Sequence, residues 1–260
     1  MLKKAAALLF ICASMATWVG CGSTSSRYLY AAIPGSNDIV AYREDPNTGV
    51  LTQLVGSPIS AGQSVHALAM HPSGKFLYAA NSGEGDVSLY TISTAGTLTE
   101  VTPRTNVGIA PTVLALDATG GFLYTANKLD STISEFPIAA DGSLGGTGSA
   151  LGETFTGPLA LLIDKSGKYM YVANQASSNL AAYSVGSDGT LTLLTGSPFG
   201  TGSNPSVLAG DSSGKYLFVG NQPGSGAVIQ SFSLDTGTGT LTSVNSYGVP
   251  GNITSIVVTP

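Results

Sequence analysis

The sequence predicts an all-β fold, a β-propeller of five four-stranded blades, on three observations. Five segments align as copies of one unit, and an aromatic residue recurs in them at spacings of 48, 46, 47 and 47 residues. These aromatics are Tyr30, Tyr78, Tyr124, Tyr171 and Phe218. The composition, with 34 Gly, 13 Pro and 10% charged residues, is typical of short strands joined by tight turns. Sheets that repeat every roughly 40 to 50 residues bury their faces against neighbouring copies, as propeller blades do.

Each copy contains four segments with the alternating or continuously apolar pattern of a strand. In the second copy we expect strands at residues 65–70, 76–80, 87–92 and 98–101. A turn of the type Asp-x-Ser-Gly-Lys joins the first two strands, with an Asp that accepts backbone hydrogen bonds and a glycine at positive φ. A second glycine, followed two residues later by Leu, marks the turn between the third and fourth strands.

The two ends of the repeat region predict how the propeller closes. The first copy starts at its second strand, whereas the last residues, GNITSIVVTP, match the first strand of the other copies. We therefore expect residues 253–259 to pair beside residues 28–32 and complete the first blade, which hides two strand edges. Residues 27–260 then form one propeller domain.

Residues 1–20 are predicted to be an export signal. Lys3 and Lys4 precede an apolar stretch at residues 5–15 that is too short to span a bilayer stably. The following Trp18-Val19-Gly20-Cys21 resembles a bacterial lipobox, although Trp18 stands where an aliphatic residue is usual. We expect a lipid on Cys21 and a linker at 21–26, so the protein is placed in the bacterial cell envelope. The alternative is an ordinary secretory signal that is cleaved nearby.

The charge of the mature chain excludes some partners. Without Lys3 and Lys4, 8 of the 10 Lys and Arg remain against 15 Asp and Glu, a net charge of about −7. Nucleic acid is therefore not expected to bind. The sequence contains no phosphate-binding glycine loop, no metal-type His pair and no nucleophile elbow. We expect no cofactor, no metal, contact with membranes through the lipid anchor alone, and a monomer.

The motifs KFLYAAN and KYMYVAN, each preceded by a Ser-Gly turn and followed by GTLT, resemble the repeats of the lactonase-type β-propeller family, which includes 6-phosphogluconolactonases. They are also similar to the YVTN repeats of microbial surface proteins. The resemblance implies a propeller and suggests lactone hydrolysis. Two features depart from the family: its enzymes typically have seven blades, and they carry His, Arg and Glu around the channel mouth, whereas this chain has only 2 His.

A candidate site lies where the first strands of the copies begin, since these strands line the channel of a propeller and one mouth is built from variable loops. The aligned residues there are His66, Thr112, Leu159, Ser206 and Thr254. His66 occupies the family-like position, where a neutral imidazole can deprotonate a water that attacks a lactone carbonyl. The alternative is a histidine that bonds to backbone in a polar channel.

Two charged residues on neighbouring mouth loops complete the candidate site. Arg104 is expected to bind a substrate carboxylate and Glu153 to orient His66; the alternative is that both are solvated loop charges. Thr112, Ser206 and Thr254 would add substrate hydrogen bonds. His71 replaces the turn Asp, and the asparagines that end the second strands recur regularly, so both are read as structural.

Two functions remain open. The first is hydrolysis of a small, unphosphorylated lactone such as a sugar lactone, favoured by His66 and its polar neighbours. The second is a non-catalytic cell-envelope propeller that binds a glycan or a protein, favoured by the sparse charge and the mouth loops rich in Ser, Thr and Gly. The fold alone does not choose between them.

The expected anchor predicts that Cys21→Ser releases the protein from membranes, because the thioether-linked lipid is lost. The measurement is membrane fractionation, with intact-mass analysis of the processed N-terminus as the control. A variant that still sediments with membranes, or an unmodified Cys21 in the wild type, would contradict the prediction.

Overall fold

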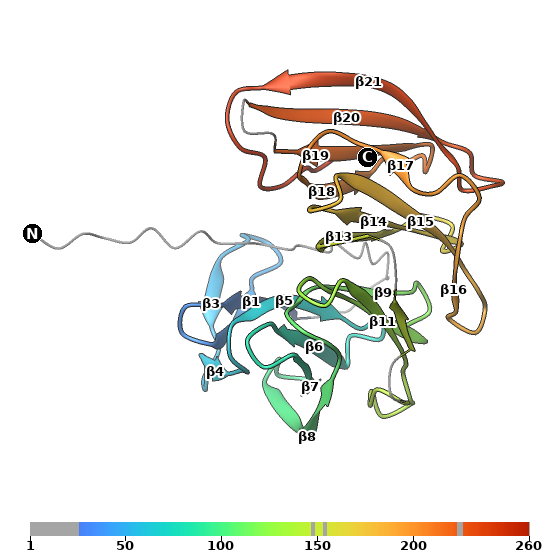
Figure 1. Cartoon of the computed structure of the whole chain (residues 1–260). Helices are drawn as coiled ribbons and strands as arrows, with labels where there is room; N and C mark the ends of the chain where they lie inside the picture. Colours follow the sequence, from blue (N-terminus) through green and yellow to red (C-terminus); the bar gives the residue numbers. More distant parts are fainter. Residues whose placement is uncertain (1–25, 147–148, 153–154, 223–225, 260) are drawn as a thin grey trace, which may run out of the picture. The chain divides into compact units, whose positions relative to one another are not determined.

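The computed structural model describes residues 26–146, 149–152, 155–222 and 226–259, with the backbone alone for 149–152. All of the regular structure in these residues is antiparallel β (Figure 1). None of them belongs to a helix long and apolar enough to cross a membrane. The chain divides into two compact units, the first ending at Asn106 and the second starting at Val107.

The first unit contains two sheets, which match the first two copies of the repeat. One sheet has the order β1-β2-β3, with β4 also paired to β2, and the other has the order β5-β6-β7-β8. The strands are β1 (Arg27–Ile33), β2 (Asp38–Glu44), β3 (Leu51–Gln53), β4 (Ile59–Ser60), β5 (Val65–Met70), β6 (Phe76–Asn81), β7 (Asp86–Ile92) and β8 (Leu98–Asn106).

The second unit contains three sheets, in the orders β9-β10-β11-β12, β13-β14-β15-β16 with β17 also on β15, and β18-β19-β20-β21. The first four strands are β9 (Pro111–Leu116), β10 (Phe122–Asn127), β11 (Thr132–Pro137) and β12 (Ser149–Gly152). The middle sheet has β13 (Pro158–Ile163), β14 (Tyr169–Asn174), β15 (Asn179–Val185), β16 (Leu191–Leu193) and β17 (Phe199–Gly200). The last has β18 (Pro205–Gly210), β19 (Tyr216–Asn221), β20 (Ala227–Leu234) and β21 (Leu241–Val249).

The outer strand differs between sheets, which the sequence did not reveal. In the first and fourth copies it is split into β3 and β4, and into β16 and β17, by a turn in which Ser57 or Ser197 donates its N–H to the carbonyl of Leu54 or Leu194. In the second copy it is continuous and longer than expected, because β8 runs to Asn106 rather than ending at Val101.

The predicted turns between the first and second strands are confirmed. Gly74, Gly120, Gly167 and Gly214 have φ between 69° and 75°. The Asp164 carboxylate accepts backbone N–H bonds from Ser166, Lys168 and Tyr169 at 2.8–3.0 Å. In the second copy His71 takes this place, and its Nδ1 accepts the N–H of Ser73 at 3.1 Å. The structural interpretation of His71 is therefore confirmed.

The middle sheet of the second unit is buried on both faces. Tyr171 and Ala173 point to one side, where they pack with Leu217 and Val219 of β19. Their neighbours Met170 and Val172 point to the other side and pack with Tyr124 of β10. Alternate residues of one strand thus enter two cores, as the period of two in a β-strand requires.

One hydrogen bond recurs between adjacent sheets within each unit. The hydroxyl of the repeat tyrosine donates to the carbonyl of the glycine in the outer turn of the next sheet. The pairs are Tyr30 with Gly96 at 2.7 Å, Tyr124 with Gly189 at 2.8 Å, and Tyr171 with Gly239 at 2.8 Å. Burial raises the pKa of these hydroxyls, so they stay protonated donors at neutral pH. We call this contact the Tyr–Gly bond.

The acceptor of each Tyr–Gly bond has to be glycine for two reasons. At Gly239 the backbone has φ +74°, which other residues rarely adopt. A Cβ atom there would also lie 2.4 Å from the ring of Tyr169, which lies against the turn. The fifth repeat aromatic, Phe218, is partly buried and has no hydroxyl to donate.

The C-terminal segment is the part of the chain that was expected to complete the first blade. Residues 252–259 have no strand assignment, and the partner of β1 among the described residues is β2. Ile253 is 8% exposed and lies against Gly220 of β19, and its carbonyl accepts a hydrogen bond from Gln222 Nε2. Closure of the first blade by this segment stays a prediction.

The Tyr–Gly bond predicts that Tyr171→Phe lowers the free energy of unfolding by about 1–3 kcal/mol, because the buried Gly239 carbonyl loses its donor while the ring keeps its packing. The measurement is urea denaturation at neutral pH. The matched control is Tyr247→Phe, at a tyrosine that is 52% exposed, for which we expect a change below about 0.5 kcal/mol. Equal effects of the two changes would contradict the prediction.

Candidate active site at the start of the first strands

Four of the five residues aligned at the start of the first strands share a feature that the sequence did not reveal: each of the four is the extra residue of a β-bulge. In β5, Val65 pairs with Asn81 and Ala67 with the adjacent Ala80, so the register shifts at His66, which is the extra residue on its strand. The same irregularity occurs at Thr112 in β9, Leu159 in β13 and Ser206 in β18. A bulge redirects a side chain, and bulges are common next to active sites.

The backbone ahead of each bulge explains its position. The residue two places earlier lies in the left-handed region, with φ of 53° at Ser64, 57° at Ala110 and 55° at Asn204. In three of the four first strands a proline follows it, which is tolerated at the first position of a strand. Those prolines were a usable sequence signal for the bulges.

The loop that leads into His66 is held by three hydrogen bonds within the first unit. Gly62 N–H donates to Asn81 Oδ1 at 3.2 Å, Gln63 N–H to Glu84 Oε2 at 3.2 Å, and Ser64 N–H to Asn37 Oδ1 at 2.7 Å. The side chain of His66 itself is exposed. The arrangement therefore presents an accessible imidazole on a fixed backbone.

Arg104 lies inside β8 and not on a mouth loop, which corrects the sequence prediction. Its Nε donates to Glu100 Oε1 at 2.7 Å and its Nη1 to Glu84 Oε2 at 2.6 Å. Since Glu84 also accepts the N–H of Gln63, the ion pair reaches the loop before His66. These contacts give Arg104 a part in positioning this loop; its contact with a substrate carboxylate stays a prediction.

Arg104, Glu84, Glu100 and Asp86 lie close together, and we call them the Arg104 cluster. With three carboxyl groups and one guanidinium, the cluster is acidic overall. Partial burial raises the pKa of Asp86, and the nearby Glu84 and Glu100 raise it further, against the lowering effects of Asn81 and Arg104. Asn81 Nδ2 donates to Asp86 Oδ1 at 2.7 Å. Burial and the Glu100 charge also raise the pKa of Tyr90 to about 12. No group of three or more His, Cys, Asp or Glu within the described residues is arranged to hold a metal ion.

In the second unit the predicted hydroxyl residues bond mainly to backbone. Thr112 Oγ1 donates to the carbonyls of Ala126 at 3.4 Å and Pro158 at 3.5 Å. Ser206 Oγ donates to the carbonyl of Gly220 at 3.5 Å and accepts a hydrogen bond from Gln222 Nε2 at 3.2 Å. Thr254 is exposed and lies outside any strand. Gln222, which joins Ser206 to the carbonyl of Ile253, was not identified from the sequence.

The predicted residues therefore fall into separate groups. His66 and Arg104 belong to the first unit, and Thr112, Ser206 and Thr254 to the second. Glu153 and Cys21 lie outside the described residues. Convergence of these groups on one mouth stays a prediction.

The repeated asparagines have the structural role that was predicted. Asn81 bonds to the Gly62 N–H through Oδ1, and Asn127 Nδ2 donates to the Val107 carbonyl at 2.9 Å. Asn221 departs from this pattern, with a buried Oδ1 that has no hydrogen-bond partner among the described residues. Gly202 holds the position that Gly62 has in the second copy, but its N–H donates to Gln230 Oε1 at 3.1 Å and not to Asn221.

The sequence matches the family described as "Lactonase, 7-bladed beta-propeller" over residues 22–161 and 147–258. The chain belongs to this lactonase family. Its fold is thus an all-β propeller, with five repeats where the family description gives seven blades. A search of curated proteins finds no significant sequence match.

Solved structures support the propeller fold of this lactonase-family chain. A putative 6-phosphogluconolactonase from Bacteroides uniformis aligns with a TM-score of 0.71 and 19% identity, over 88% of this chain and 70% of that one. The periplasmic gluconolactonase of Pseudomonas aeruginosa aligns with a TM-score of 0.68 and 22% identity, over 86% and 68%. A Lactobacillus plantarum protein gives 0.73 and 21%, over 86% and 69%. At these identities the likeness shows the fold alone.

The Arg104 cluster of this lactonase-family protein predicts a pH-dependent effect of Arg104→Met. We expect the free energy of unfolding to fall by about 1–2 kcal/mol at pH 7, because Glu84 and Glu100 lose their partner. Without the guanidinium the pKa of Asp86 rises further, so the folded variant binds protons more strongly than the wild type. Its deficit should therefore shrink as the pH falls towards about 4.

The measurement is urea denaturation at a series of pH values. The matched control is Arg27→Met, since Arg27 is 63% exposed and contacts Glu44 at 3.6 Å. We expect a change below about 0.5 kcal/mol for this control at every pH. A deficit of Arg104→Met that stays constant with pH would contradict the prediction.

Proposed function

We propose that this protein hydrolyses lactones with water that is deprotonated by His66. The observation that carries the proposal is that, among the bulge residues of the described first strands, His66 is the one ionisable residue, in a chain that belongs to the lactonase family. Its exposed side chain and the three hydrogen bonds that fix the preceding loop suit a base that meets a substrate from solution.

The chemistry needs one group that takes a proton and returns it. The imidazole of His66 accepts a proton from water while the water oxygen bonds to the lactone carbonyl carbon. The tetrahedral intermediate then breaks the ring C–O bond, and the leaving alkoxide takes the proton from the imidazolium. The product is the open-chain hydroxy acid. Glu153 would orient the imidazole in this scheme, and Thr112, Ser206 and Thr254 would bond to substrate hydroxyls.

The proposed substrate is a small lactone without a phosphate. Two of the mature chain's cations are already neutralised: Arg104 by Glu84 and Glu100, and Arg27 by Glu44. Lys165 donates to a backbone carbonyl. Phosphate recognition usually relies on several convergent cations or backbone amides, so the charge distribution favours an unphosphorylated ring. The similar structures include a protein called a gluconolactonase and two called putative 6-phosphogluconolactonases.

We propose in addition that the protein is exported and anchored through a lipid on Cys21. The support is the charged and apolar N-terminal sequence, the lipobox-like residues before Cys21, and the structural likeness to an enzyme described as periplasmic. An envelope location would also supply substrates from outside the cytoplasm.

The second candidate function is glycan binding without catalysis. Its supporting observation is the hydroxyl and amide character of Thr112, Ser206 and Gln222, which can exchange hydrogen bonds with sugar hydroxyls.

The test is an assay of hydrolysis on a panel of simple sugar and aromatic lactones, in which the reaction is measured by the release of protons. His66→Gln should lower kcat/KM by about 100- to 10,000-fold, the usual contribution of a general base, with little change in the free energy of unfolding. The matched control is His71→Asp, which replaces the other histidine with the residue that the repeat carries at this turn and should keep full activity. A phosphorylated lactone should react no faster than its unphosphorylated counterpart.

Two outcomes would overturn the proposal: no lactone in the panel is hydrolysed above background, or His66→Gln keeps wild-type activity. The first outcome would favour the glycan-binding function, and a glycan array would then be the next measurement.

A further inference from the structure

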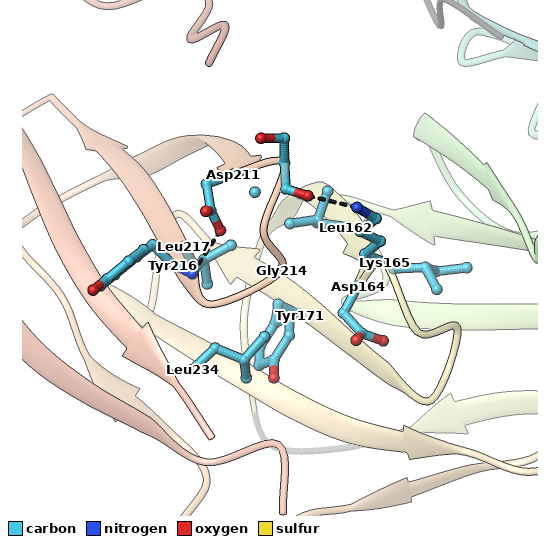
Figure 2. Close-up of a pocket in the computed structure, with 12 residues that line it drawn as sticks. Leu162, Asp164, Lys165, Tyr171, Asp211, Gly214, Tyr216, Leu217 and Leu234 are labelled. Carbon is cyan, nitrogen blue, oxygen red and sulfur yellow. Dashed lines mark hydrogen bonds between the residues drawn. The ribbon is translucent and has the colours of Figure 1, made fainter. Parts of the chain in front are cut away.

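A pocket of about 360 Å³ opens between the β13–β17 and β18–β21 sheets of the second unit. It lies at the ends of β13 and β18, whereas the bulge residues Leu159 and Ser206 lie at the starts of the same strands. Figure 2 shows its lining, in which Leu162, Tyr171, Leu217 and Leu234 form an apolar floor. The volume is at the lower end of the range for small-molecule sites, about 300–1,000 Å³.

The pocket exists because the last residue of β18 departs from the repeat. The first strands β5, β9 and β13 end in Met70, Leu116 and Ile163, whereas β18 ends in Gly210. In the preceding sheet Ile163 packs into the core between neighbouring sheets. At Gly210 no side chain does so, and a Cβ added there would meet Leu162 at an ordinary 3.5 Å. The space is therefore open to a guest molecule of about the size of the missing side chain or larger.

A second departure from the repeat places a cation at the same pocket. Lys165 stands where the other turns have Pro72, Ala118 and Ser212. Its Nζ reaches the neighbouring turn and donates to the Ser212 carbonyl at 2.6 Å (Figure 2). An ammonium group has three donors, so this bond leaves two for a ligand at the rim.

The two acidic residues at the rim are already engaged. Asp164 accepts N–H bonds from Lys168 and Tyr169, and Asp211 accepts them from Lys215 and Tyr216, at 2.8–3.0 Å. Their charges still disfavour an anion between them, while Lys165 disfavours a cation. The electrostatics and the apolar floor together select an uncharged ligand.

The geometry points to a binding site for a small, uncharged, mainly apolar molecule whose carbonyl or hydroxyl oxygen accepts a hydrogen bond from Lys165. The apolar part fills the space that Gly210 leaves, against Leu162, Leu217 and Leu234. The site is independent of the proposed hydrolysis and lies at the opposite end of the first strands.

The probe for this site is Prodan, an uncharged naphthalene ketone whose emission shifts to the blue in apolar surroundings. We expect saturable binding to the wild-type protein with a blue shift. Gly210→Leu, which restores the side chain that the repeat has in β9, should weaken binding by at least about tenfold because it fills the pocket. Gly210→Ala introduces a smaller side chain into the same space and serves as the test if the leucine variant does not fold. It should weaken Prodan binding less than Gly210→Leu does.

Lys165→Met should weaken Prodan binding by about tenfold, since one charge-assisted hydrogen bond is lost while the apolar contacts remain. The matched controls are Gly248→Leu, at an exposed β21 glycine with no atom within 4 Å of an added Cβ, and Lys168→Met in the same turn. Both should bind Prodan as the wild type does. The inference is overturned if wild-type binding does not saturate, if Gly210→Leu and Gly210→Ala bind as the wild type does, or if the controls lose as much affinity as the pocket variants.

Discussion

The Tyr–Gly bond is the contact on which the arrangement of neighbouring sheets depends. It places a buried phenol of one sheet, such as that of Tyr171, against the outer turn of the next sheet. The acceptor glycine has a positive φ, and its missing Cβ leaves room for the ring two residues before the tyrosine, which is Tyr169 in this case. The bond is directional, whereas the apolar contacts around it are not, so it fixes which turn meets which strand. Exchange of the tyrosine for phenylalanine removes the hydrogen bond, and exchange of the glycine for a larger residue disturbs the fit of the neighbouring ring.

With the sheets held in this way, the two ends of each first strand are free to differ. At the start, a bulge presents a residue whose chemistry differs between copies, from histidine to leucine. At the end, the turn keeps its shape with either Asp or His as the acceptor of backbone N–H bonds, and single positions such as Gly210 and Lys165 vary. Function can therefore change at either end without a change in the strand pairing that supports it.

The sequence was sufficient for the repeats, the turns and the structural role of the asparagines, because each of these recurs and follows from local geometry. It was not sufficient for the bulge at His66, since alternation of side chains does not show at which residue the strand register shifts. The place of Arg104 depended on where β8 ends and on Glu84, 20 residues away in sequence. The pairing of residues 253–259 with the first blade stays a prediction, because it concerns contacts that no local pattern fixes.

The Tyr–Gly bond also bears on how the number of blades can change during evolution. Donor and acceptor lie 65–68 residues apart, which is more than one repeat of about 47, so each bond joins one copy to the following copy. Loss or duplication of one whole repeat by unequal recombination places the tyrosine of one copy beside an equivalent glycine of another copy. A junction that has the Tyr–Gly bond can therefore keep it. Loss of part of a repeat would leave a phenol or a carbonyl unpaired. Selection on this contact therefore favours the gain or loss of whole repeats over the gain or loss of partial ones.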